Sequence, residues 1–264
     1  MIIYSGLPRS GTNLLKNILS QNNNIQVNHE SALCNMVLST LESVNMYKND
    51  HYYDDSLQGL EILLNNFIKG GIFEIDKSIN KTHINHSKLW NQYIPTMTSL
   101  GFKVIFSVRK ITDILYSFEQ QRNKYLSGDN LQNLNCNNPF IGMLEKHENG
   151  TFFKSAVTFL NDVCTNLEKY KKNLLIVKYE DLINSPNKII NQIYSFINVD
   201  FYPHDLNNIP TYNINDMHVA SRRGISHEVR PQLDAILKQN KLKKDVEEYF
   251  EEKYHSIYRL LGYN

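Results

Sequence analysis

The chain has 264 residues and a formal net charge of +1, and this composition limits what the protein can be. With 41% hydrophobic and 21% charged residues, it is typical of a soluble globular protein, and no apolar run approaches the ~18 residues of a spanning helix. Because Lys plus Arg is 28 against Asp plus Glu 27, no overall basic field favours nucleic acid as a partner. Any anion-binding site must therefore be local.

The three cysteines indicate the redox environment. Cys34, Cys136 and Cys164 are too few and too scattered for a disulfide framework or a zinc site, which favours a reducing compartment. The first six residues have the pattern of a strand entering a turn rather than that of a secretory signal. We therefore expect a cytoplasmic protein.

The order of the predicted elements indicates the fold class. Short runs rich in β-branched and aromatic residues predict buried strands at 2–4, 25–27, 103–108 and 174–177. Apolar residues at helical spacing lie between them, around 14–19, 57–67 and 152–167. This alternation predicts an α/β fold with a mostly parallel central sheet flanked by helices, and a ligand site beyond the carboxyl ends of the strands.

Two later segments lie outside this alternation, and we expect one domain over residues 1–264. The polar, Asn-rich stretch 123–150 carries Gly128, Pro139 and Gly142, which favours a long lid or acceptor-site loop. Residues 230–261 are rich in Lys and Glu with scattered apolar residues. They predict a solvated C-terminal helix or helical pair that covers one face of the sheet.

A glycine-rich heptapeptide, Gly-Leu-Pro-Arg-Ser-Gly-Thr, occupies positions 6–12 between the first strand and the first helix. Backbone N–H groups and the helix N-terminus can bind an anion at such a junction, although an ordinary glycine turn is the alternative. Thr12 stands where a P-loop kinase has lysine, and Asn13 stands where it has the Mg²⁺-binding hydroxyl. We therefore expect no metal, because Arg9 can neutralise a phosphate or sulfate by itself.

The segment 8–12 resembles the 5′-phosphosulfate loop of the sulfotransferases, which use 3′-phosphoadenosine 5′-phosphosulfate as sulfuryl donor. The resemblance implies the P-loop-like fold of that family, with a donor site formed at the loop by Arg9, Ser10, Gly11, Thr12 and Asn13. The second signature of the family is an arginine at a strand end and a serine eight positions later, both at the 3′-phosphate. Arg109 and Ser117 match it. Taken alone, Arg109 could be a solvated strand-end residue.

Two further segments support the resemblance. Tyr-Glu-Asp-Leu at 179–182 is similar to the segment in which the tyrosine of the family touches adenine, which implies that role for Tyr179. The acidic pair could instead cap a helix, with Tyr179 in the core. Ser-Arg-Arg-Gly at 221–224 resembles the element that closes over the 3′-phosphate, implying Arg222, Arg223 and Gly224. A solvated turn is the alternative there.

The resemblance also implies catalytic residues. Lys81, after a possible strand, matches the lysine that stabilises charge on the leaving phosphate, with Arg9 as a second cation; a solvated lysine is the alternative. His83 matches the base of cytosolic small-molecule enzymes, and Glu30 matches the base of tyrosylprotein and carbohydrate enzymes. The N-terminal part is more similar to the second group, so we favour Glu30. Its alternative role is to complement a helix dipole.

The sequence thus predicts metal-independent, in-line transfer of a sulfuryl group to a hydroxyl or amine of a small molecule, glycan or peptide, without nucleic acid or membrane as a partner. It does not indicate the oligomeric state. A P-loop kinase of small metabolites is the first alternative, disfavoured by Thr12 and Asn13. A catalytically silent nucleotide-binding module is the second, disfavoured by the retention of Arg9 and Lys81.

Overall fold

The computed structural model describes residues 1–28, 34–37, 39–40, 42, 66, 68–70, 80–125, 151–210, 233, 242 and 244–263. Most of the helix expected around 57–67, residues 126–150 of the expected lid, Glu30 and the 222–224 segment lie outside these residues.

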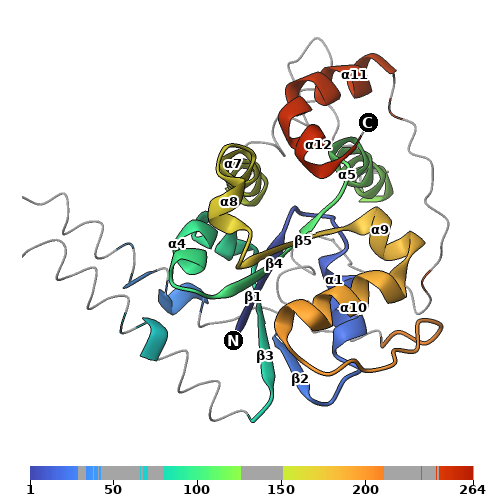
Figure 1. Cartoon of the computed structure of the whole chain (residues 1–264). Coiled ribbons are helices and arrows are strands. Elements are labelled where there is room, and N and C mark those ends of the chain that lie inside the picture. The colour runs from blue at the N-terminus through green and yellow to red at the C-terminus, as the bar shows by residue number, and fades with distance from the viewer. Residues whose placement is uncertain are drawn as a thin grey trace, which may run out of the picture.

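A parallel five-stranded sheet in the order β2-β3-β1-β4-β5 forms the centre of the described molecule (Figure 1). Its strands are β1 (Ile2–Gly6), β2 (Ile25–Asn28), β3 (Thr82–His86), β4 (Lys103–Val108) and β5 (Leu174–Lys178). All neighbouring pairs are parallel, so the carboxyl ends of the strands share one edge of the sheet. The predicted α/β class and the four predicted strands are confirmed.

The possible strand that the sequence analysis expected before Lys81 falls on residues 71–79, which lie outside the described residues. Strand β3 begins at Thr82, directly after that lysine, and the sequence analysis did not predict it. Its sequence, Thr-His-Ile-Asn-His, lacks the apolar run that marks a buried strand, yet four of its five residues are buried. Asn85 is fully buried because its Oδ1 accepts a hydrogen bond from Trp90 Nε1 at 2.9 Å.

Helices cover both faces of the sheet, and the alternation of side chains along β1 divides the core between them. Ile2 and Tyr4 point to the face covered by α1 (Thr12–Leu19) and α10 (Pro186–Ile197). Ile3 points to the opposite cluster, which belongs to η1 (Lys88–Gln92), α4 (Ile94–Ser99), α5 (Ile111–Tyr125), α7 (Thr151–Thr165) and α8 (Leu167–Tyr170). None of the helices in the described part of the chain is long and apolar enough to span a membrane.

The predicted C-terminal helical pair is present as α11 (Lys244–Lys253) and α12 (His255–Leu261). It packs mainly on α5 and α7 rather than on the sheet itself (Figure 1). Its apolar residues Val246, Phe250 and Ile257 are buried in the same cluster as Ile3. The pair is therefore an integral part of the core and places its polar groups beside the start of α5.

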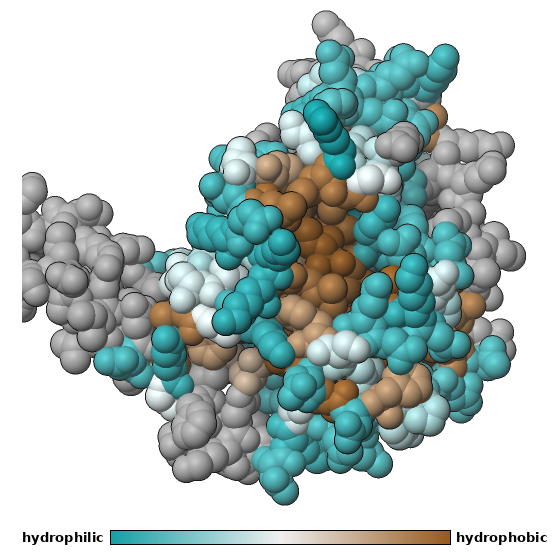
Figure 2. Space-filling model, viewed as in Figure 1, coloured by the Kyte–Doolittle hydropathy of each residue, from teal (hydrophilic) through white to brown (hydrophobic). Residues whose placement is uncertain are grey.

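A hydrophobic recess lies beside β5, the last strand of the sheet (Figure 2). It encloses about 200 Å³ and is lined by side chains of β5, α10 and α12, among them Leu175, Ile189 and Leu261. Helix α9 (Tyr179–Asn184) follows β5 directly and contributes Asp181 to the same wall. The recess separates α12 from α10.

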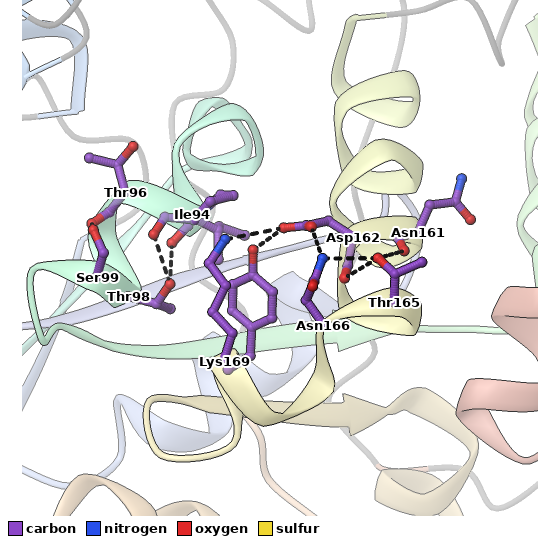
Figure 3. A network of polar contacts seen from close by, with 11 residues as sticks. Ile94, Thr96, Thr98, Ser99, Asn161, Asp162, Thr165, Asn166 and Lys169 are labelled. Carbon is purple, nitrogen blue, oxygen red and sulfur yellow. Dashed lines mark hydrogen bonds and ion pairs between the residues drawn. The ribbon is translucent and has the colours of Figure 1, made fainter.

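A polar network fixes the junction of α7 and α8 (Figure 3). Asp162 accepts hydrogen bonds from the buried Tyr170 hydroxyl and, at 2.8 Å, from Asn166 Nδ2. Lys169 Nζ lies 3.6 Å from the same carboxylate. The Tyr170 hydroxyl above all, with Asn166 and Lys169, holds the pKa of Asp162 below its usual value.

We expect Asp162→Asn to lower the free energy of unfolding by about 1 kcal/mol at pH 7, because hydrogen bonds to a partly exposed charged group contribute roughly this much. A carboxylate whose pKa is lowered by folding stabilises the fold above its unfolded pKa. The difference from wild type should therefore shrink below about pH 4 in urea denaturation. Glu168→Gln, on an exposed pair with Lys171, is the control and should change little. A pH-independent loss would contradict this account.

Candidate functional site

The loop between β1 and α1 wraps over the carboxyl end of the sheet. Gly6 is packed so closely on β4 that a Cβ there would lie 2.4 Å from Ser107 O, and Leu7 N–H donates to the same oxygen at 2.9 Å. Arg9 and Gly11 both adopt left-handed conformations, with φ of 63° and 79°. Helix α1 then begins at Thr12 with no side chain capping it, so its first N–H groups are available to an anion.

The two predicted donor motifs meet at this loop. Arg9 Nε donates a hydrogen bond of 3.1 Å to Ser117 Oγ on α5. Arg109 Nη1 donates one of 3.3 Å to the carbonyl oxygen of Arg9. Residues 100 positions apart in sequence are thus in direct contact, and two guanidinium groups stand beside the N-terminus of α1.

Tyr179, the first residue of α9, packs between Arg109 and the loop. The guanidinium carbon of Arg109 lies 4.5 Å from the centroid of the Tyr179 ring. A Cβ on Gly11 would lie 2.5 Å from Tyr179 Cδ2. Arg109 Nε is 3.9 Å from Asp113 Oδ2 and has no hydrogen-bond partner among the described residues. A donor of this kind is suited to a bound anion.

Buried polar side chains hold the loop in place by hydrogen bonds. Tyr4 Oη lies 2.8 Å from Ser107 Oγ and donates to Thr12 O at 3.3 Å, while burial raises the pKa of this phenol. Asn91 Nδ2 donates to Gly6 O at 3.3 Å. Sequence reasoning missed Tyr4 and Asn91, and nothing local in the sequence marks them, because their partners lie on other elements.

Lys81 and His83 are not brought to the loop. Lys81 precedes β3, and His83 is the second residue of that strand, paired with Gln26 of β2. Because Ile84 pairs with Ile2, His83 lies five residues before the level of Gly6, about 16 Å along the strand direction. His83 is also buried, which lowers its pKa. This placement does not support the catalytic roles expected from their match to the family.

His86 ends β3 at the edge of the sheet where the loop lies. It pairs with Tyr4, two residues before Gly6, and the two rings lie 5.3 Å apart. Sequence reasoning passed over it because His83 lies in the better motif match. The signal available was its position, three residues later, at the carboxyl end of a strand.

The other predicted site residues lie outside the described part of the chain: Glu30, Arg222, Arg223 and Gly224. β2 ends at Asn28, two residues before Glu30, at the same edge of the sheet as the loop.

A family model described as a sulfotransferase domain matches residues 1–257. The chain belongs to the sulfotransferase family. Solved structures share the fold: a sulfotransferase domain of the curacin biosynthetic pathway has a TM-score of 0.56 at 19% identity, over 96% of this chain and 97% of its own. A mouse sulfotransferase complexed with PAP has a TM-score of 0.51 at 15% identity, over 98% and 84%.

A sulfotransferase from Alicyclobacillus acidocaldarius has a TM-score of 0.51 at 13% identity, over 100% of this chain and 96% of its own. No curated protein sequence matches the chain. The structural likeness confirms the predicted P-loop-like α/β fold, and the family model confirms that this chain is a sulfotransferase.

We expect Gly11→Ala to destabilise this sulfotransferase more than Gly101→Ala does. Both glycines have positive φ, but a Cβ at Gly101 meets nothing within 4 Å, whereas one at Gly11 collides with Tyr179. Gly101→Ala should therefore cost only the left-handed strain of about 1–2 kcal/mol, and Gly11→Ala at least about 1 kcal/mol more, measured by urea denaturation. Equal losses would contradict the packing of Tyr179 on the loop.

Proposed function

We propose that this sulfotransferase takes the sulfuryl group from 3′-phosphoadenosine 5′-phosphosulfate and transfers it to a hydroxyl or amine of a small molecule, glycan or peptide. The observation that carries the proposal is the contact of Arg9 with Ser117 and Arg109 at an uncapped helix N-terminus. Two phosphate-binding motifs of the family are thereby joined in one site. A donor that carries phosphate groups at both the 3′ and the 5′ position of its ribose fits such a site.

Each group of residues has a proposed role toward the donor. Arg9 and the loop residues Ser10, Gly11, Thr12 and Asn13 bind the 5′-phosphosulfate, with backbone N–H groups of the loop and of α1 as donors. Arg109 and Ser117 bind the 3′-phosphate, together with Arg222, Arg223 and Gly224. Tyr179 contacts the adenine.

In-line sulfuryl transfer requires stabilisation of the charge that develops on the leaving 5′-phosphate oxygen. Lys81 lies away from the loop. Within the described part of the chain, Arg9 is therefore the cation that we assign to stabilise this charge. We propose that no metal takes part, since Thr12 and Asn13 stand in place of the kinase residues and Arg9 supplies positive charge. We also propose the cytoplasm as the location, because the three scattered cysteines favour a reducing compartment.

The 123–150 segment was expected as a lid or acceptor-site loop, but residues 123–125 belong to α5. For the rest of the segment, 126–150, we keep the lid or acceptor-site loop as a proposal.

We expect adenosine 3′,5′-bisphosphate to bind more tightly than ADP by about 2–3 kcal/mol, because charge-assisted hydrogen bonds from Arg109 to the 3′-phosphate have no equivalent with ADP. Arg109→Ala should remove most of this preference in calorimetry performed with EDTA. Arg259→Ala, which removes an exposed arginine on α12, is the matched control. Equal affinities of the wild type for the two nucleotides would refute the proposed donor.

We propose that Glu30 accepts the proton of the acceptor, because the N-terminal part resembles the tyrosylprotein and carbohydrate enzymes. Glu30→Gln should lower kcat by roughly 10²–10⁴ with nearly unchanged affinity for adenosine 3′,5′-bisphosphate, because the amide keeps its shape but loses basicity. His83→Asn should have little effect on kcat, because His83 lies near the amino end of β3, away from the loop at the carboxyl end of the sheet.

His86→Asn separates Glu30 from the second candidate base. His86 lies at the carboxyl end of β3 beside Tyr4, so its position is compatible with a base. Near-normal turnover in Glu30→Gln with a loss of kcat in His86→Asn would assign the proton transfer to His86 instead.

A further inference from the structure

Glu180 connects the chain's C-terminal region to the turn that carries Arg109. One carboxylate oxygen of Glu180 accepts a hydrogen bond from the backbone N–H of Lys110 at 3.0 Å, and the other accepts one from the Tyr263 hydroxyl at 2.6 Å. Burial and the charge of Glu180 raise the pKa of Tyr263, so its hydroxyl keeps the proton that it donates. Tyr263 thus fixes the carboxylate that holds the residue after Arg109.

Two further contacts reach the same turn from α11 and α12. The hydroxyl of Tyr258 accepts a hydrogen bond of 3.2 Å from the backbone N–H of Thr112, in the first turn of α5. The side chain of Lys110 lies 3.3 Å from Glu247 and 2.6 Å from Glu251, both on α11. The first N–H groups of a helix have no partner within it, and here Tyr258 supplies a partner for the N–H of Thr112 while Glu180 supplies one for the N–H of Lys110.

These contacts reach the turn that carries Arg109, and Arg109 is also held by α9. The ring of Tyr179 packs under the guanidinium of Arg109, and Glu180 follows Tyr179 directly in α9. Ser117 lies two helical turns further along α5, so the direction of α5 determines where Ser117 meets Arg9. A shift at the start of α5 would therefore move both Arg109 and Ser117.

We propose that Tyr258, Tyr263, Glu247 and Glu251 form a C-terminal clamp that positions Arg109 and Ser117 for the 3′-phosphate of the donor. The inference rests on the proposed function, because it assigns the clamp to the phosphate site named there. These four are positioning residues: each acts through Lys110, Glu180 or the backbone of α5. The clamp contacts lie where this helical pair, remote in sequence, packs beside α5.

Conservative variants can remove the clamp contacts one at a time. Tyr263→Phe deletes the hydroxyl but leaves the ring, which is held by Lys178 at 4.4 Å and by an edge contact with Tyr258. Glu251→Gln removes one charge from the pairing with Lys110. The matched controls on α11 are Tyr249→Phe and Glu252→Gln, at exposed positions.

The experiment measures the affinity of each full-length variant for adenosine 3′,5′-bisphosphate and for ADP by calorimetry, and amide hydrogen exchange of the peptide 109–118. Tyr263→Phe and Glu251→Gln should weaken bisphosphate binding about five- to tenfold, the effect of one lost hydrogen bond, with ADP binding unchanged. Exchange in the peptide 109–118 should rise. The control variants should match wild type in all three measurements.

The possible outcomes separate this inference from the proposed function. If wild type prefers the bisphosphate and Arg109→Ala abolishes the preference, while the clamp variants bind both nucleotides like wild type or lose both equally, the clamp is wrong and the donor assignment stands. If wild type shows no preference, the donor assignment fails and the clamp's function fails with it. A selective loss of bisphosphate affinity in the clamp variants, absent from the controls, supports the inference.

Discussion

The close approach of β1 and β4 at Gly6 and Ser107 determines the geometry of the whole site. Only hydrogen fits on the Cα of Gly6, because a Cβ would lie 2.4 Å from Ser107 O. This contact lets Leu7 donate to the same oxygen and directs the loop across the end of β4, toward Arg109. A bulkier residue at Gly6 would separate the two strands at the point where the loop and the β4–α5 turn must meet.

The positive charge at the site results from this geometry rather than from the net charge of the chain. A chain with a net charge of +1 has no global field for an anion, yet the loop places Arg9 against Ser117 and its carbonyl against Arg109. The carbonyl of Arg9 and the Tyr179 ring offset part of the cost of bringing two guanidinium groups together. A bound dianion would complete the compensation, which is the physical reason that this arrangement suits a phosphorylated donor.

The parts of the fold that local sequence could predict are those whose causes are local. The strand at 103–108 contains the apolar run Val-Ile-Phe at 104–106, and the glycine loop has its own conformational signature, so the sequence predicts both where they occur. Strand β3 was not predicted, because its polar residues give no strand pattern, and a hydrogen bond such as that from Trp90 to Asn85 is not marked by the alternation of apolar and polar residues. Arg109 and Ser117 are marked only by the family pattern of an arginine and a serine eight positions apart. Their contacts with Arg9 span about a hundred residues of sequence, so no local pattern indicates them.

The C-terminal contacts could not be predicted from local sequence either, because they join residues far apart in the chain. Tyr263 contacts Glu180 across 83 residues, and Tyr258 contacts Thr112 across 146 residues. The composition of 230–261 predicts a solvated C-terminal helix or helical pair covering one face of the sheet but none of these contacts, because Glu and Lys at helical spacing are most often surface residues. The ion pairs of Lys110 are partly exposed, so they contribute little to global stability. Their value is directional: weak interactions that fail to stabilise a fold can still determine where one backbone turn lies. The position of that turn decides whether the two residues that we propose to bind the 3′-phosphate face the same ligand.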